Sequence, residues 1–226
     1  MTLFLGKLFA SDWFWSLGDI FLGIVLFSAI GLYAYRESSD ASNLGRRYVL
    51  IAKLIIWARI LYSGFITCAQ YLVWSQSEVS RIFLTLPADA RSLPMYGFLA
   101  PIFKWSGGYF TLYSFLHFWL PTLISIAIGY IFLVFLRLLR KHKDRFFESG
   151  EVELGWVLAL IVGYPNFIIF LPLVFFLIIP ISIVRMAVLK QHLTTIGYPM
   201  ILSAIFAVIL GTQIMDVLGW GALKLW

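Results

Sequence analysis

The stretch Leu154–Val184, LGWVLALIVGYPNFIIFLPLVFFLIIPISIV, decides the fold because it contains no charged residue and is interrupted at one point. It is longer than the roughly 20 residues with which one helix crosses a bilayer core about 30 Å thick. The interruption is the tetrapeptide GYPN at 163–166, and proline disfavours helix in the residue before it. The chain is therefore predicted to turn near Pro165, between a short helix over Phe147–Val162 and a second helix over Phe167–Val184.

The rest of the chain has the same character. Of its 226 residues 62% are apolar, 18% are aromatic and 12% are charged, where a soluble domain carries about 25% charged residues. Four further stretches are long enough to span a bilayer, namely Trp13–Tyr35, Val49–Trp74, Tyr109–Phe135 and Tyr198–Leu218. The sequence predicts an all-α, polytopic integral membrane bundle of about six transmembrane helices, forming a single domain over residues 1–226.

The basic residues predict the orientation of this bundle. Eleven of the 17 cations fall in alternate connections: Arg36, Arg46, Arg47, Lys53, Arg137, Arg140, Lys141, Lys143, Arg145, Arg185 and Lys190. Cytoplasmic loops are enriched in lysine and arginine, so these connections are expected on the cytoplasmic side of the plasma (inner) membrane, with both termini on the other side. The net charge of +6 thus reflects topology and does not indicate nucleic-acid binding.

The outer connection Ser75–Gly108 is the one long loop. Its portion Pro94–Trp105 is too apolar for water and too short to span, so it is expected to lie along the membrane interface. A lid or a partner-docking patch is the alternative interpretation. Tryptophans near this side, Trp74 and Trp105 among them, are expected to form an aromatic belt.

Ionisable residues within the apolar stretches are candidates for function, because a charge in hydrocarbon is costly. Arg59 is expected either to extend toward the cytoplasmic headgroups or to contact a substrate or lipid phosphate. Asp19 is expected at a different depth, so that no direct pair forms, and Asp216 is read as an interfacial acid. The single cysteine, Cys68, is read as a small buried hydrophobe.

Several classes of chemistry lack their motifs. His117 alone among the three histidines lies within an apolar segment, which predicts neither a haem nor a metal site. The chain has no serine elbow, no HExxH and no glycine-rich phosphate loop. No cofactor, metal or nucleic-acid partner is therefore expected.

Two short elements carry a resemblance to a known family. The residues Gly150, Glu151, Val152, Glu153 and Leu154 follow a basic connection, and Gly197, Tyr198 and Pro199 open the last apolar stretch. These elements resemble the Gly-Asp-Val-Lys-Leu and Phe-Gly-Pro elements of the prepilin peptidases, membrane aspartic proteases of the GxGD type. The break at 163–165 also resembles that family's Gly-Trp-Pro break. The resemblance covers Tyr109–Trp220 best and the first two helices weakly.

The resemblance implies a catalytic pair of aspartates that share a proton and activate a water. Glu151 occupies the position of one of them, and Asp40, with Glu37 beside it, is the acid nearest the expected place of the other. The family's Asp-Ile-Pro is absent at Asp40, and Asp89 falls in the outer loop. A purely structural interpretation of Glu151 is that Ser149 caps a helix whose first turn carries acids that the macrodipole favours.

Three functions remain open on these grounds. The leading hypothesis is a prepilin-peptidase-like membrane protein that has lost or altered proteolysis and serves as a structural or binding component. Its partners would be membrane lipids and a membrane protein or leader peptide. The second is a working aspartic endopeptidase that cleaves leader peptides at the cytoplasmic face with Glu151 and Asp40. The third is a small transporter or lipid-handling protein that uses Arg59.

Overall fold

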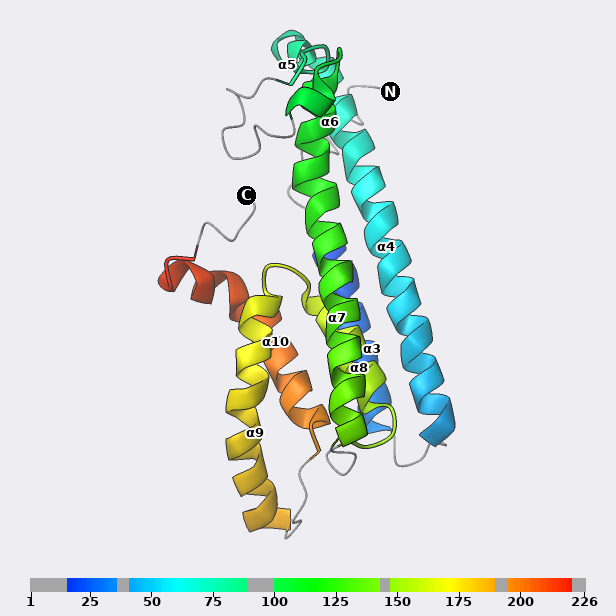
Figure 1. Cartoon of the computed structure of the whole chain (residues 1–226), viewed down its shortest axis with the longest axis vertical. Coiled ribbons are helices and arrows are strands. Elements are labelled where there is room, and N and C mark those ends of the chain that lie inside the picture. Colours follow the sequence, from blue (N-terminus) through cyan, green and yellow to red (C-terminus); the bar gives the residue numbers. More distant parts are fainter. Residues whose placement is uncertain (1–15, 36–40, 89–99, 143–146, 190–194, 221–226) are drawn as a thin grey trace. The chain divides into compact units, whose positions relative to one another are not determined.

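The computed structural model describes residues 16–35, 41–88, 100–142, 147–189 and 195–220, and all regular structure in these ranges is helical (Figure 1). The longer helices are α3 (Leu17–Ala34), α4 (Ala41–Gln76), α7 (Leu120–His142), α8 (Glu151–Val162), α9 (Phe167–Leu189) and α10 (Gly197–Val217). The shorter elements are α5 (Glu78–Phe83), the 3₁₀ turn η3 (Ala100–Phe103), α6 (Gly108–Ser114) and the π-helical turn η4 (Phe115–Trp119).

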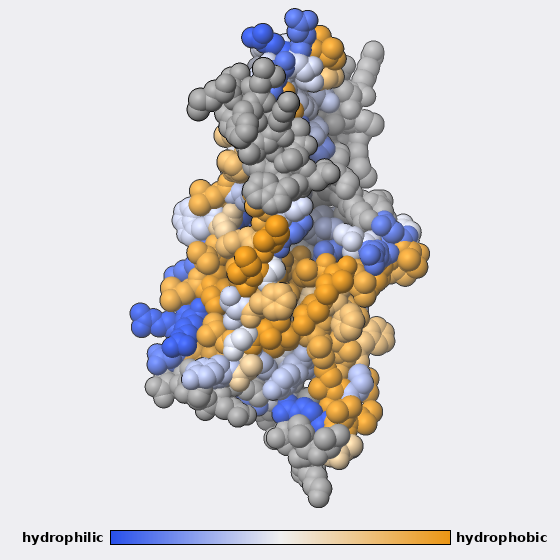
Figure 2. Space-filling view, turned by 180° about the vertical axis from the view of Figure 1, so that it is seen from behind, coloured by the Kyte–Doolittle hydropathy of each residue, from blue (hydrophilic) through white to orange (hydrophobic). Residues whose placement is uncertain are grey.

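Five helical segments of the described chain are long and apolar enough to cross a membrane. They are Leu17–Ala34, Asn43–Gln76, Gly108–His142, Phe167–Ala187 and Gly197–Val217. Apolar side chains make up most of the coloured surface in the face shown in Figure 2, and large ones such as Phe27 and Phe176 are more than 70% exposed. A surface of this kind suits lipid as its surroundings, so the fold is an α-helical membrane bundle.

The sixth expected span is the short helix α8. Its 12 residues rise only about 18 Å, less than the roughly 30 Å of the hydrocarbon core. The predicted turn at 163–166 is confirmed, because α8 ends at Val162 and α9 begins at Phe167 and runs back in the opposite direction (Figure 1). Helix α8 is therefore too short to cross the hydrocarbon core as a helix, and the count of about six spans is not confirmed.

The start of α8 differs from the prediction. The helix begins at Glu151 rather than at Phe147, and its N-cap is Gly150, whose φ of 85° lies in the left-handed region. Ser149 is thus one residue outside the cap position, and no side chain caps the helix from Gly150. The sharp turn through glycine brings the polar segment 147–150 back against the helix instead of extending it.

Every residue of α8 except Glu153 is buried. A helix that is apolar all round belongs in the interior, and small residues on its neighbours allow the backbones to approach closely. A Cβ at Gly129 of α7 would lie 2.6 Å from Leu160 Cδ2, and one at Gly155 would lie 3.0 Å from Met200 Sδ of α10. Helix α8 is the central element of the core that α3, α4, α7, α9 and α10 complete.

The described residues form two compact units. One contains residues 16–20 and Arg59–Thr122, and the other contains Phe21–Ala58 and residues 123–220. We refer to them as the aromatic unit and the α8 unit. The aromatic unit takes its name from rings that pack on Trp74 of α4, namely Phe83, Tyr109, Phe110 and Tyr113.

Helix α4 is longer than its apolar stretch suggested. It begins at Ala41 rather than Val49 and has 36 residues, which corresponds to about 54 Å. Its polar first turns are helical as well. Hydropathy identifies only the part of a helix that suits lipid, so it does not locate the first backbone hydrogen bond of the helix. A helix of this length exceeds the hydrocarbon core, so the rings around Trp74 suit the membrane–water interface.

Candidate functional site

Among the described acids of the α8 unit, Glu151 is the one with a fully buried side chain. Its Oε1 accepts a hydrogen bond from the Tyr33 hydroxyl at 2.7 Å and another from the Gly197 amide at 3.1 Å. Its Oε2 accepts one from the Glu148 amide at 3.0 Å. Three donors from three separate parts of the chain thus converge on one acid, which we call the Glu151 hub.

The local fold around Gly150 places Glu151 in this position. The Glu151 amide donates to the Glu148 carbonyl at 3.2 Å while its carboxylate accepts from the Glu148 amide, a reciprocal arrangement similar to a capping box. Gly150 lies against the start of α4, where a Cβ would be 3.2 Å from Leu44 Cδ2. Glycine suits this position because it tolerates positive φ and because a Cβ would press on the Leu44 side chain.

Gly197 is the first residue of α10, and its amide is one of the donors that a helix leaves unpaired at its start. Glu151 supplies the acceptor from another helix. A Cβ at Gly197 would overlap both Glu151 Oε1 and the Tyr33 hydroxyl. The structure thus brings together the two sequence elements around Glu151 and Gly197, which lie 46 residues apart.

Aromatic and basic groups extend the hub toward one end of the unit. The Tyr33 ring meets the Tyr198 ring edge to face, with centroids 5.1 Å apart. The Arg185 guanidinium lies 5.3 Å from the Tyr198 centroid, and its Nη1 donates to Thr195 Oγ1 at 3.2 Å. These contacts hold Arg185 of α9 against the start of α10.

The described residues include only one acid of the predicted dyad, Glu151. Asp40, Glu37 and Asp89 lie outside the described residues, so the predicted pair of Glu151 with Asp40 stays a prediction. Glu153 points toward the start of α4, where a Cβ at Gly45 would be 3.7 Å from its Oε2. The described geometry therefore assigns Glu151 a role in joining helices.

Asp19 and Arg59 both belong to the aromatic unit and lie at closer levels than the sequence predicted. Gly18, the residue before Asp19, packs against Tyr62 of α4. A Cβ added at Gly18 would lie 2.7 Å from Tyr62 Cε1. Because α4 begins eight residues earlier than expected, Arg59 lies near the middle of that helix and level with the start of α3.

The aromatic unit also contains a polar contact at the π-helical turn η4. The Ser63 hydroxyl donates to the Phe118 carbonyl at 3.1 Å and lies 2.7 Å from Thr122 Oγ1. Trp119 Nε1 donates to Thr67 Oγ1 at 3.2 Å. A π-helical turn changes the register of backbone hydrogen bonds, and α4 supplies hydroxyl partners at this turn.

His117 and Cys68 are two further residues that the sequence analysis considered. The His117 ring stacks on Tyr113 with centroids 3.8 Å apart, and its Nδ1 lies 2.8 Å from the Tyr113 carbonyl. Cys68 is exposed on α4, which corrects the prediction that it is buried; the lipid-facing side of a membrane helix is as apolar as its interior. No group of three or more metal-binding side chains occurs among the described residues.

Tyr33 is the hub residue that sequence reasoning missed. It occurs in an apolar stretch 118 residues from Glu151, and no motif marks it. The chain matches no known family model, no curated protein and no solved structure. The hub therefore has to be interpreted from its own geometry.

Proposed function

We propose that this chain is a non-proteolytic integral membrane protein that acts as a structural or binding component of the plasma (inner) membrane, with both termini on the outer side. The family elements around Glu151 and Gly197 serve here to join helices. The prepilin-peptidase-like arrangement of the last four helices is part of this proposal and rests on the sequence elements alone.

The burial of Glu151 is the single observation that carries the proposal. The carboxylate is 0% exposed, and both of its oxygens accept hydrogen bonds from the chain itself. A proteolytic acid has to reach a water and a second carboxylate at the scissile bond. An acid that holds Tyr33, Gly197 and Glu148 together suits a structural role better.

A leader-cleavage assay tests the proposal. The parent protein, reconstituted in vesicles with a prepilin-type leader substrate, is expected to give no cleaved product. Glu151→Gln is expected to lower the thermal unfolding midpoint, because a glutamine amide replaces one of the two carboxylate oxygens that accept hydrogen bonds from Tyr33, Gly197 and Glu148 with an NH₂ donor. Glu151→Asp keeps the carboxylate but shortens the side chain. Its thermal unfolding midpoint is expected to lie between those of the parent protein and of Glu151→Gln.

The opposite result has a clear signature. If the parent cleaves the leader and both Glu151→Gln and Asp40→Asn abolish cleavage while remaining folded, the protein is an aspartic endopeptidase. The proposal then fails, and the pair predicted from the sequence becomes the catalytic dyad.

A further inference from the structure

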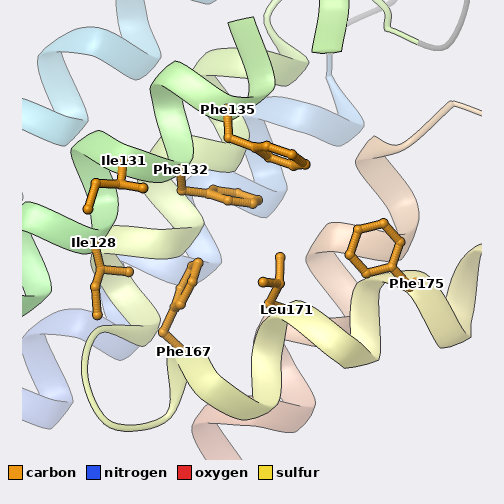
Figure 3. A pocket seen from close by; sticks show the side chains of 7 residues that line it. All are labelled: Ile128, Ile131, Phe132, Phe135, Phe167, Leu171 and Phe175. Carbon is orange, nitrogen blue, oxygen red and sulfur yellow. The ribbon is translucent and has the colours of Figure 1, made fainter. Parts of the chain in front are cut away.

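An apolar groove lies between α7 and α9 in the α8 unit. It has a volume of about 280 Å³ and is lined by seven side chains, all apolar: Ile128, Ile131, Phe132, Phe135, Phe167, Leu171 and Phe175. Figure 3 shows the rings of Phe132 and Phe135 extending from α7 toward Leu171 and Phe175 of α9. Phe167 lies at the other end, beside the loop that joins α8 to α9 (Figure 3).

The lining residues of the groove follow one another along the two helices. Its residues on α9 are spaced by four, as Phe167, Leu171 and Phe175, and those on α7 run from Ile128 to Phe135. Residues with this spacing share one face of a helix. Because Ile131 and Phe175 are more than half exposed, the groove opens to the lipid-facing surface.

A positive charge continues the same face of α9. Arg185 follows Leu171 by 14 residues, which is close to four full turns at 3.6 residues per turn. Along the helix it lies about 15 Å beyond Phe175. Its contacts with Thr195 and Tyr198 keep the guanidinium near the start of α10.

We propose that this groove binds an acyl chain of an anionic phospholipid whose phosphate contacts Arg185. An apolar channel open to hydrocarbon suits an alkyl chain, and the arginine on the same helical face suits the negative headgroup at the membrane surface. The order of groups along α9, apolar first and basic last, matches the order of chain and headgroup in a phospholipid. This inference does not depend on the role of Glu151.

The experiment measures lipid retention by the purified full chain. Protein in detergent is mixed with phosphatidylglycerol or phosphatidylcholine of the same acyl chains, exchanged into lipid-free detergent, and examined by native mass spectrometry. The parent is expected to retain one phosphatidylglycerol in preference to phosphatidylcholine. Arg185→Gln is expected to reduce this preference by about fivefold, the equivalent of about 1 kcal/mol for one basic residue near an anionic lipid.

Filling the groove tests the acyl-chain part. Leu171→Trp is expected to lower retention of both lipids by about tenfold, equivalent to about 1.4 kcal/mol, because the indole ring occupies space that the acyl chain would fill. Ile183→Trp is the matched control, because Ile183 is exposed on α9 outside the groove lining. Arg137→Gln is the charge control. Arg137 lies two residues, or about 200° of rotation, from Phe135 on α7, so it is on the side of the helix away from the groove.

Three results would overturn the proposal. Unchanged retention in Leu171→Trp would show that lipid does not occupy the groove. Equal losses in the Arg185→Gln and Arg137→Gln variants would show a general effect of surface charge. Conversion of a dimer to a monomer by Leu171→Trp, measured by light scattering at constant lipid content, would assign the groove to a second copy of the chain.

Discussion

The Tyr33 hydroxyl donates a 2.7 Å hydrogen bond to Glu151 Oε1, and the two residues are 118 positions apart in the chain. Both side chains are buried, at 3% and 0% exposure. This bond joins the end of α3 to the start of α8, and the Gly197 amide adds the start of α10 to the same oxygen. The position of three helix ends therefore depends on one carboxylate.

Removal of the Tyr33 hydroxyl tests this dependence directly. Tyr33→Phe keeps the ring and its edge contact with Tyr198, and leaves one donor fewer on a buried acid. We expect a loss of about 1–2 kcal/mol in the free energy of unfolding, since a hydrogen bond to a charged group is worth somewhat more than a neutral one. The measurement is chemical or thermal unfolding in detergent.

The control for this variant is Tyr130→Phe, because the Tyr130 side chain is 48% exposed on α7. Tyr130→Phe is expected to have the same unfolding midpoint as the parent protein, within measurement error. Equal midpoints for the Tyr33 and Tyr130 variants would mean that the hydroxyl contributes nothing to the hub.

Gly197→Ala tests the close approach of α10 to the hub. The added methyl group would overlap Tyr33 and Glu151, so the start of α10 has to move. The hydrogen bond from the residue 197 amide to Glu151 is then lost. Overpacking of this kind costs about 1–3 kcal/mol, and we expect a matching fall in the thermal midpoint and in the yield of folded protein.

Gly31→Ala in α3 is the matched substitution, because nothing lies within 4 Å of a Cβ at that position. Alanine favours helix over glycine by about 1 kcal/mol, so this variant should be neutral or slightly more stable. A stability for Gly197→Ala equal to that of Gly31→Ala would contradict the close approach.

Ser63→Ala tests the support of the π-helical turn in the aromatic unit. The change removes the donor to the Phe118 carbonyl and the partner of Thr122. Hydrogen bonds between membrane helices average about 0.6 kcal/mol and reach about 1.7, and we expect a loss within that range, measured by unfolding in detergent.

Ser28→Ala serves as the control, because its exposed hydroxyl bonds only within α3, to the Ile24 carbonyl. We expect no resolvable change there. If both serine variants unfold at the midpoint of the parent protein, α4 does not stabilise the π-helical turn.

Cysteine labelling tests the proposed orientation. In a Cys68→Ser background, a thiol introduced by Ser106→Cys is expected to react with a membrane-impermeant maleimide added to intact cells, because Ser106 lies in the predicted outer connection. A thiol introduced by Ser42→Cys is expected to react only after the membrane is permeabilised, since the cations around it favour the cytoplasmic side. The reverse pattern would invert the topology.

The sequence predicted the elements of this fold well. Long apolar stretches predict membrane helices because the bilayer imposes a fixed length and requires internal backbone hydrogen bonds. The break at Pro165 was predictable for a local reason, the missing donor and steric restriction of proline. The helix ends were less predictable, as the early start of α4 and the late start of α8 show, because polar turns beyond the hydrocarbon leave no hydropathy signal.

The contacts of the site were decided by the tertiary structure alone. The resemblance to the prepilin peptidases drew attention to Glu151, at the start of one apolar stretch, and to Gly197, at the start of another. Their bond, the part played by Tyr33 and the level of Arg59 beside Asp19 depend on how far each helix slides along its neighbours. Within the α8 unit, small residues such as Gly129 and Gly155 allow the close approach of neighbouring helices. Lipid-facing and buried faces are too similar in polarity for hydropathy to reveal such contacts.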